Sequence, residues 1–246
     1  MKSTLIQVND LTVGWDQHVL LKGISFDVRR GDIFVILGSS GCGKSTLLRY
    51  LIGLETPLAG SIDIAGFGAP RLEGTRPEYG VMFQSGALFG SMTVGENVGF
   101  ALQEWTGLPT EAVNAIAKAK LALVGLEGAA DKLPSELSGG MKKRAAIARA
   151  MAFEPSLIFL DEPSAGLDPV SAAELDELIL ALNRGIGLTV VMVTHELESI
   201  FKVGKTCIML DKETKGIIAS GNPNTLKAES QDPRVQQFFR REGRVH

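Results

Sequence analysis

The sequence is short of features that mark several classes of protein. It has two cysteines, Cys42 and Cys207, among 246 residues, too few and too far apart for a disulfide framework or a metal cluster. Its net charge of −3 gives no reason to expect nucleic acid as a partner, since such a partner usually requires a basic face. We therefore expect no nucleic-acid partner and a reduced, cytoplasmic setting.

Long hydrophobic runs are also missing. The longest apolar stretches, such as residues 157–160 and 190–193, have the length of strands and fall far short of the ~20 residues that cross a bilayer. Residues 1–13 alternate polar and apolar side chains and lack the continuous apolar segment of a signal peptide. We expect that the chain does not cross a membrane itself, so that any membrane role comes through a partner.

What is present is an ordered series of strand and helix patterns. Turn residues such as Asn9-Asp10 and Arg30-Gly31-Asp32 separate the first strands. Strands are predicted at 5–8, 11–15, 24–28, 33–37, 61–64, 79–83, 157–160, 188–193 and 206–210, and helices at 44–52, 111–124, 141–151, 170–182 and 196–203. Such alternation favours an α/β fold with a parallel sheet flanked by helices.

A glycine-rich run, GSSGCGKS at residues 38–45, lies between a predicted buried strand and a predicted helix. It matches a phosphate-binding loop, in which glycines let backbone N–H groups surround phosphates and the helix N-terminus adds a positive dipole end. Lys44 would reach the β- and γ-phosphates, and the Ser45 hydroxyl would hold Mg²⁺. The alternative is a flexible glycine turn with an unrelated lysine. The context favours nucleotide binding.

A second pattern is the apolar run 157–160 followed by Asp161 and Glu162. Acidic residues at the end of a buried strand are costly unless they serve a cation or a charged ligand. Beside a phosphate loop, Asp161 would support Mg²⁺ and Glu162 would act as the general base on water. The alternative is a strand that simply runs out into solvent.

With Leu137-Ser138-Gly139-Gly140-Met141 added, the chain resembles the ABC transporter ATPases, and the remaining motifs occur in the order of that family. The resemblance implies a P-loop fold with an ABC-type nucleotide-binding domain: a mixed-sheet core at 1–84 and 153–230, a helical subdomain at 85–152 and a tail at 231–246. It implies an ATPase that uses ATP and Mg²⁺ and works as a homodimer with two ATP molecules in the interface.

The same resemblance implies a role for each matching residue. Gln84 would touch Mg²⁺ and relay to a membrane partner, His195 would contact the γ-phosphate, and Asp168 would lie in the loop that crosses the dimer interface. Ser138 and Gly140 would bind the ATP of the opposite subunit, and Trp15 would stack on adenine. The expected catalytic residues are Lys44, Glu162 and His195; the metal ligands are Ser45, Gln84 and Asp161. The expected ATP-binding residues also include Gly38, Ser39, Gly41, Cys42, Gly43 and Thr46.

The substrate is suggested by finer similarities. Met141 stands where the family more often has glutamine, which puts one contact to the nucleotide in doubt. Together with FQSGALF at 83–89 and DPRV at 232–235, it is similar to the ATPases of Mla-type phospholipid transporters. That group implies an integral permease that contacts residues 85–92, an MCE-domain protein, a STAS-domain protein and a place on the cytoplasmic face of the inner membrane.

Two alternatives remain open. One is a soluble ABC ATPase without a permease, of the cluster-assembly type, and the other is an ABC ATPase for a substrate that is not a lipid. The arginine-rich tail, with Arg234, Arg240, Arg241 and Arg244, is expected to be a solvated helical end. Contact with a neighbouring subunit, with anionic lipid or with an acidic partner is the alternative.

Overall fold

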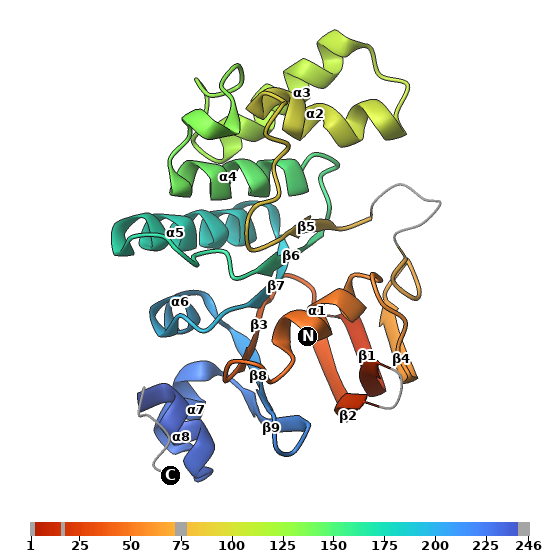
Figure 1. Cartoon of the computed structure of the whole chain (residues 1–246), viewed down its shortest axis with the longest axis vertical. Helices are drawn as coiled ribbons and strands as arrows, with labels where there is room; N and C mark the ends of the chain where they lie inside the picture. Colours follow the sequence, from red (N-terminus) through yellow and green to blue (C-terminus); the bar gives the residue numbers. More distant parts are fainter. Residues whose placement is uncertain (1–2, 16–17, 72–77, 241–246) are drawn as a thin grey trace. The chain divides into compact units, whose positions relative to one another are not determined.

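The glycine-rich turn joins a strand to a helix, as predicted (Figure 1). A computed structural model describes residues 3–15, 18–71 and 78–240. The chain forms two units, one made of Met1–Glu73 with Thr189–His246 and the other of Gly74–Leu188. The predicted helical subdomain at 85–152 lies within the second unit. The predicted division into core, helical subdomain and tail stays a prediction.

The first unit contains an antiparallel three-stranded sheet and a set of mainly parallel strands. The antiparallel sheet has the order β2-β1-β4, and the second set has the order β7-β3-β8-β9. Strand β3 runs parallel to both β7 and β8, whereas β9 is antiparallel to β8. The strands are β1 (Thr4–Trp15), β2 (His18–Arg29), β3 (Ile33–Gly38), β4 (Ala59–Ile64), β7 (Thr189–Val193), β8 (Thr206–Asp211) and β9 (Gly216–Gly221).

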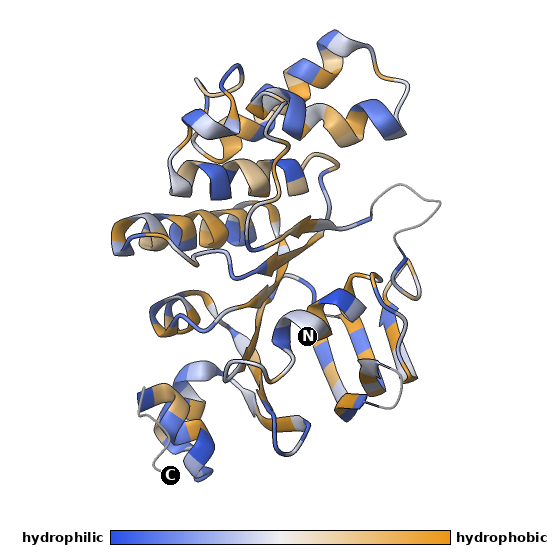
Figure 2. Cartoon of the chain, viewed as in Figure 1, coloured by the Kyte–Doolittle hydropathy of each residue, from blue (hydrophilic) through white to orange (hydrophobic). Residues whose placement is uncertain are grey.

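Burial differs between these two sets of strands. Every residue of β3 and β7 is buried, and β3 is hydrophobic along almost its whole length in Figure 2. Strand β1 instead alternates buried and exposed residues over much of its length. Parallel strands covered on both faces have continuous apolar sequences, whereas strands with one solvated face alternate. The apolar run at residues 33–37 therefore reflects a position in the interior.

Among its described residues the first unit has four helices: α1 (Lys44–Leu51), α6 (Leu197–Val203), α7 (Pro223–Glu229) and α8 (Pro233–Arg240). Helix α1 begins directly after the glycine-rich turn. Its fully buried Tyr50 donates a hydrogen bond from the hydroxyl to the Gly14 carbonyl over 2.8 Å and accepts one from the Gly14 N–H over 3.2 Å. These two hydrogen bonds of the buried Tyr50 hydroxyl fix α1 against β1. They therefore also fix the position of the turn that precedes α1.

In the part of the second unit that the structure describes there are two short parallel strands and four α-helices. Strand β5 places Met82 opposite Leu160 of β6, so the segments that follow the two strands leave the same edge. Asn97 is fully buried and its side chain bonds to the backbone of Phe89, Met92 and Thr93. The elements are β5 (Gly80–Met82), α2 (Val94–Trp105), α3 (Thr110–Leu123), a 3₁₀ turn (Pro134–Glu136), α4 (Gly139–Ala150), β6 (Leu157–Asp161) and α5 (Pro169–Ile186).

The prediction of a turn at Asn9-Asp10 is wrong, because β1 is one continuous strand. The two polar residues form an irregularity in its pairing, where the register shifts between Val8 and Leu11. Asp10 has φ 46, and its N–H donates to the Ser25 hydroxyl over 2.9 Å. Turn-favouring residues therefore make a β-bulge here, which keeps the strand direction.

The prediction of a solvated helical tail is wrong for one face of α8. Val235 is fully buried and Phe239 is 5% exposed, with the Phe239 ring centroid 5.4 Å from that of Phe201. Arg234 donates to Asp232 over 2.6 Å and to Asp211 over 3.2 Å, so α8 is tied to the end of β8. Of the other tail arginines, Arg240 is exposed; Arg241 and Arg244 lie outside the described residues.

Candidate nucleotide site

The turn before α1 has the backbone of an anion cradle. Gly38, Gly41 and Gly43 have φ values of 146, 75 and 101, which L residues rarely adopt. A Cβ at Gly38 would lie 2.5 Å from both the Cys42 Sγ and the Leu210 carbonyl oxygen. Gly43 is the N-cap of α1, and among the described residues no side chain caps this helix. The first N–H groups of a helix that lacks a side-chain cap can bind an anion.

Lys44 brings a positive charge to the same turn. Its ammonium donates to the Gly38 carbonyl over 2.9 Å and to the Ser39 carbonyl over 3.1 Å. Ser45 is exposed and Thr46 is half-buried in the first turn of α1. The predicted phosphate ligands therefore lie together around one loop of the first unit, and this geometry fits the phosphates of a nucleotide.

Cys42 takes a structural place beneath the turn. Its side chain is 1% exposed, and burial raises the pKa of the thiol, against the opposing influence of Lys44. The other cysteine, Cys207, is also buried, and burial raises its pKa to about 12. Thiols with raised pKa values are poor nucleophiles and poor metal ligands. Any contribution of Cys42 to nucleotide binding would thus come from its backbone.

His195 follows β7, the strand that pairs with β3. Parallel pairing places Val193 of β7 opposite Ile36 of β3, so the glycine-rich turn and His195 follow the same ends of neighbouring strands. The imidazole is 57% exposed, with Nε2 3.5 Å from a Glu196 carboxylate oxygen. Trp15, at the end of β1, is 47% exposed. Both rings are accessible, and their contacts with nucleotide stay predictions.

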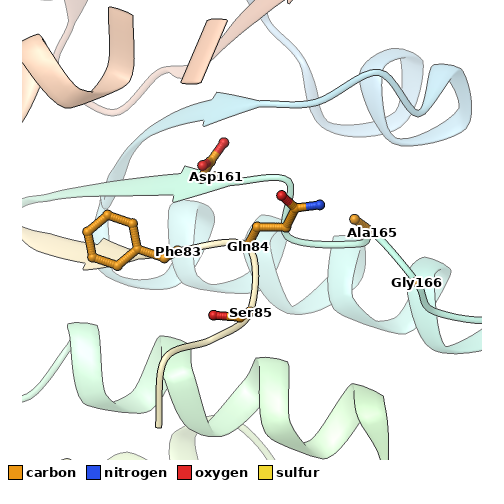
Figure 3. A pocket seen from close by; sticks show the side chains of 6 residues that line it. All are labelled: Phe83, Gln84, Ser85, Asp161, Ala165 and Gly166. Carbon is orange, nitrogen blue, oxygen red and sulfur yellow. The ribbon is translucent and has the colours of Figure 1, made fainter. Parts of the chain in front are cut away.

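Gln84 and Asp161 line one pocket of the second unit (Figure 3). Gln84 follows β5 and Asp161 ends β6, and the parallel pairing of these strands brings the two side chains to the same edge. Phe83, Ser85, Ala165 and Gly166 also line this pocket. A carboxylate and an amide oxygen are suitable ligands for Mg²⁺. Ser45, the third predicted ligand, belongs to the first unit.

Glu162 is 8% exposed and its φ is 47. A residue with a Cβ in this left-handed region carries a strain of about 1–2 kcal/mol. Lys143 of α4 donates to the Glu162 carbonyl over 3.3 Å and also to the Gln84 carbonyl. Burial lowers the pKa of Lys143, while the charges of Glu162 and Asp161 oppose this shift. One buried ammonium therefore bonds to the backbone of Gln84, a predicted metal ligand, and of Glu162, a predicted catalytic residue.

Ser138 and Asp168 are both helix N-caps. The Ser138 hydroxyl accepts from the Met141 N–H over 3.3 Å at the start of α4. The Asp168 carboxylate accepts from the N–H groups of Val170 and Ser171 at the start of α5, and hydrogen bonds from Ser171 lower the pKa of Asp168. Both residues cap a helix of their own chain. Their contacts with the nucleotide of a second copy stay predictions.

No sequence motif indicated the roles of Lys143 and Arg149. Arg149 donates to the Ala87 carbonyl over 2.6 Å and to the Gly86 carbonyl over 3.0 Å. The sequence signal for these residues was a predicted helix at 141–151, in which basic residues occur among small apolar residues on more than one face. Helical periodicity alone does not say which of these bases turns inward.

Two further structural results bear on function. In the part of the chain that the structure describes, no three His, Cys, Asp or Glu residues are grouped to hold a metal ion. Among the described helices, none combines the length and the apolar character needed to cross a bilayer.

Comparison with known proteins gives consistent matches. A family model described as ABC transporter matches residues 21–165. The intermembrane phospholipid transport system ATP-binding protein MlaF of Escherichia coli (strain K12) is 41% identical over 96% of this chain and 89% of its own. The probable ribonucleotide transport ATP-binding protein mkl of Mycobacterium tuberculosis (strain ATCC 25618 / H37Rv) is 41% identical over 95% of this chain and 66% of its own.

Solved structures agree on the fold. CbiO1 of Clostridium perfringens, part of the ABC transporter complex cbiONQ, superimposes with a TM-score of 0.82 and 30% identity over 94% of this chain and 93% of its own. A dimeric post-hydrolysis state of the ATP-binding cassette MJ0796, bound to ADP and Pi, gives a TM-score of 0.78 and 28% identity over 89% of this chain and 98% of its own.

Proposed function

The chain belongs to the ABC transporter family and is an ATPase of that family, and on this premise we propose that its ATP hydrolysis powers phospholipid transport between membranes. The observation that carries the proposal is the similarity to MlaF, a phospholipid transport ATP-binding protein, over 96% of this chain. The second relative, named for ribonucleotide transport, supports a non-lipid substrate as the alternative.

In this proposal the first unit binds the nucleotide. The N–H groups of the turn and of the first turn of α1 hold the phosphates, and Lys44 adds its charge at the β- and γ-phosphates. The Ser45 hydroxyl supplies a ligand for Mg²⁺, and Trp15 offers its exposed ring to adenine. His195 contacts the γ-phosphate.

The second unit supplies the reacting groups. Gln84 and Asp161 provide oxygen ligands for Mg²⁺, which neutralises phosphate charge when bound. Glu162 accepts the proton of the attacking water as the general base, a role worth typically ~10²–10⁴-fold in rate. Ser138, Gly140 and Asp168 belong to the interface with a second copy, because the motif around Ser138 opens a helix whose N-terminus can bind an anion.

We propose an integral permease as the membrane partner, with an MCE-domain and a STAS-domain protein in the same complex on the cytoplasmic face of the inner membrane. The permease would bind residues 85–92, where the Phe89 side chain is 47% exposed. Leu88 and Met92 of this segment are half-buried, so Phe89 is the exposed large apolar side chain of the contact.

The proposal is tested by purifying the full chain from its native membrane in mild detergent and identifying the proteins and lipids that come with it. We expect a permease, an MCE-domain protein and phospholipid. A different permease without phospholipid would contradict the lipid substrate, and soluble partners alone would favour a cluster-assembly ATPase.

Two variants sharpen this test. Phe89→Asp places a charge on the proposed contact and should remove the permease while ATP binding is retained. Phe67→Asp is the matched control, because Phe67 is 42% exposed but lies in the first unit. Equal recovery of the permease with both variants would exclude residues 85–92 as the contact.

A further inference from the structure

Among the described residues of the second unit, Ala87, Glu154 and Glu162 have positive φ, and Ala87 and Glu162 lie in the segments that follow β5 and β6. Glu162 and Ala87 both have φ 47. Strained residues of this kind persist only where their surroundings hold them, and they cluster at functional sites.

Helix α4 contributes one cation to each turn. Arg149 bonds to the carbonyls of Gly86 and Ala87, and Lys143 bonds to the carbonyls of Gln84 and Glu162. We call Lys143 and Arg149 the α4 clamp. Arg149 holds a single loop at two adjacent carbonyls, whereas Lys143 joins two segments that lie far apart in the sequence.

The position of Lys143 is costly for the fold. Only 7% of the residue is exposed, and a buried ammonium loses hydration that its partners must replace. An apolar side chain would pack in a helix of small residues without that cost. The ammonium instead contributes several N–H donors on a compact charge, which suits a junction between two carbonyls.

We propose that Lys143 is a positioning residue for hydrolysis, which holds the strained backbone of Glu162 against the Gln84 loop and so directs the Glu162 carboxylate. This inference rests on the proposed role of Glu162 as general base. The same helix begins at the Ser138 cap, so Lys143 also connects the predicted interface motif to the backbone of the reacting residue. Small errors in the position of a reacting group can cost ~10²-fold in rate.

The test compares Lys143→Met with Lys120→Met in the full chain. Lys120 is a matched control, because it is 9% exposed and donates over 2.7 Å to Glu154, a residue outside the predicted site. In single-turnover assays with protein in excess, Lys143→Met should lower the hydrolysis rate by ~10-fold or more with ATP affinity unchanged. Lys120→Met should leave the rate unchanged within about two-fold.

A double variant separates positioning from general loosening of the fold. If Lys143 acts through Glu162, adding Lys143→Met to Glu162→Gln should slow hydrolysis by no more than about three-fold further. Full additivity would overturn the inference. Lys143→Gln provides a second variant if the methionine variant does not fold, since its shorter amide cannot span both carbonyls; a wild-type rate in Lys143→Gln would also overturn it.

The outcomes distinguish this inference from the proposed function. If Glu162→Gln alone keeps the wild-type rate, the general-base role of Glu162 is wrong. If Glu162→Gln is slow but Lys143→Met behaves as Lys120→Met does, only the positioning role of Lys143 fails.

Discussion

The glycine-rich turn of the first unit and the clamped turns of the second reach unusual backbone conformations by different means. Gly38, Gly41 and Gly43 adopt positive φ without a Cβ, so their turn needs no clamp from another element. Ala87 and Glu162 carry a Cβ at φ 47, and cations of α4 bond to carbonyls in both turns. A turn made of glycine depends on local sequence, whereas a clamped turn depends on a distant helix.

Glu162→Gln should give the largest effect, because it removes the proposed base from the clamped turn without changing its shape. We expect turnover to fall by ~10²-fold or more while ATP binding is retained. Steady-state ATPase and nucleotide-binding assays measure the two quantities. Glu174→Gln is the control, because it changes a carboxylate on α5 that is 57% exposed. Wild-type turnover in Glu162→Gln would show that Glu162 is not the general base.

Gly38→Ala tests the turn that depends on glycine. Its Cβ would lie 2.5 Å from the Cys42 Sγ and the Leu210 carbonyl oxygen, at a φ of 146 that L residues rarely adopt. We expect a loss of about 3 kcal/mol or more in the free energy of unfolding, measured by denaturant titration.

Gly41→Ala is the matched control, since the described residues leave open space within 4 Å of its added Cβ. Strain alone should then cost about 1–2 kcal/mol. Equal losses for the two variants would mean that the close approach at Gly38 is relieved by a local shift.

Arg149→Met tests the clamp itself. Two carbonyls lose a charged donor, and hydrogen bonds to charged groups contribute about 1.5–3 kcal/mol each; we expect a net loss of about 2 kcal/mol in the free energy of unfolding. Ala87→Gly removes the strain that the clamp opposes. In that background no strain is released when the clamp is lost, so Arg149→Met should cost more than in the wild type. A double-mutant cycle with no coupling would contradict the link between clamp and strain.

Glu154→Gln should give the smallest effect. The hydrogen bond from Lys120 lowers the pKa of Glu154 from its ordinary value of 4.5. Because the carboxylate is 78% exposed, solvent screening reduces the contribution of this ion pair to the free energy of unfolding to about 0.5 kcal/mol or less. A lowered pKa in the folded state means that this stability is present above pH 4.5 and is lost as the pH falls. Unfolding of both proteins at pH 7 and pH 3 should show a difference that shrinks at pH 3; a growing difference would contradict the sign.

The parts of the fold that depend on local sequence could be predicted. The apolar run at 33–37 and the glycines after it indicated β3, the turn and α1, because buried parallel strands and glycine turns have short-range signatures. Asn9-Asp10 was mistaken for a turn, because the same residues also make a β-bulge when the strand on each side is paired. The buried face of α8 depends on Phe201, far away in the sequence.

In the candidate site, too, the features that depend on local sequence could be predicted and those that depend on distant contacts could not. The residue types of the phosphate turn and of Asp161 and Glu162 were visible in their motifs. The roles of Lys143 and Arg149 were not, because their partners are backbone carbonyls, and any residue can supply a carbonyl. Residues that bond to backbone leave no complementary side-chain pattern in a single sequence.

The most direct test of the proposed function is ATP-dependent transfer of a fluorescent phospholipid by the purified transporter complex in vesicles. With wild-type chain we expect ATP to drive transfer, and with Glu162→Gln in the same complex we expect ATP to bind without sustained transfer. Equal transfer with both proteins, or ATP-driven movement of ribonucleotide but not of phospholipid, would contradict the account.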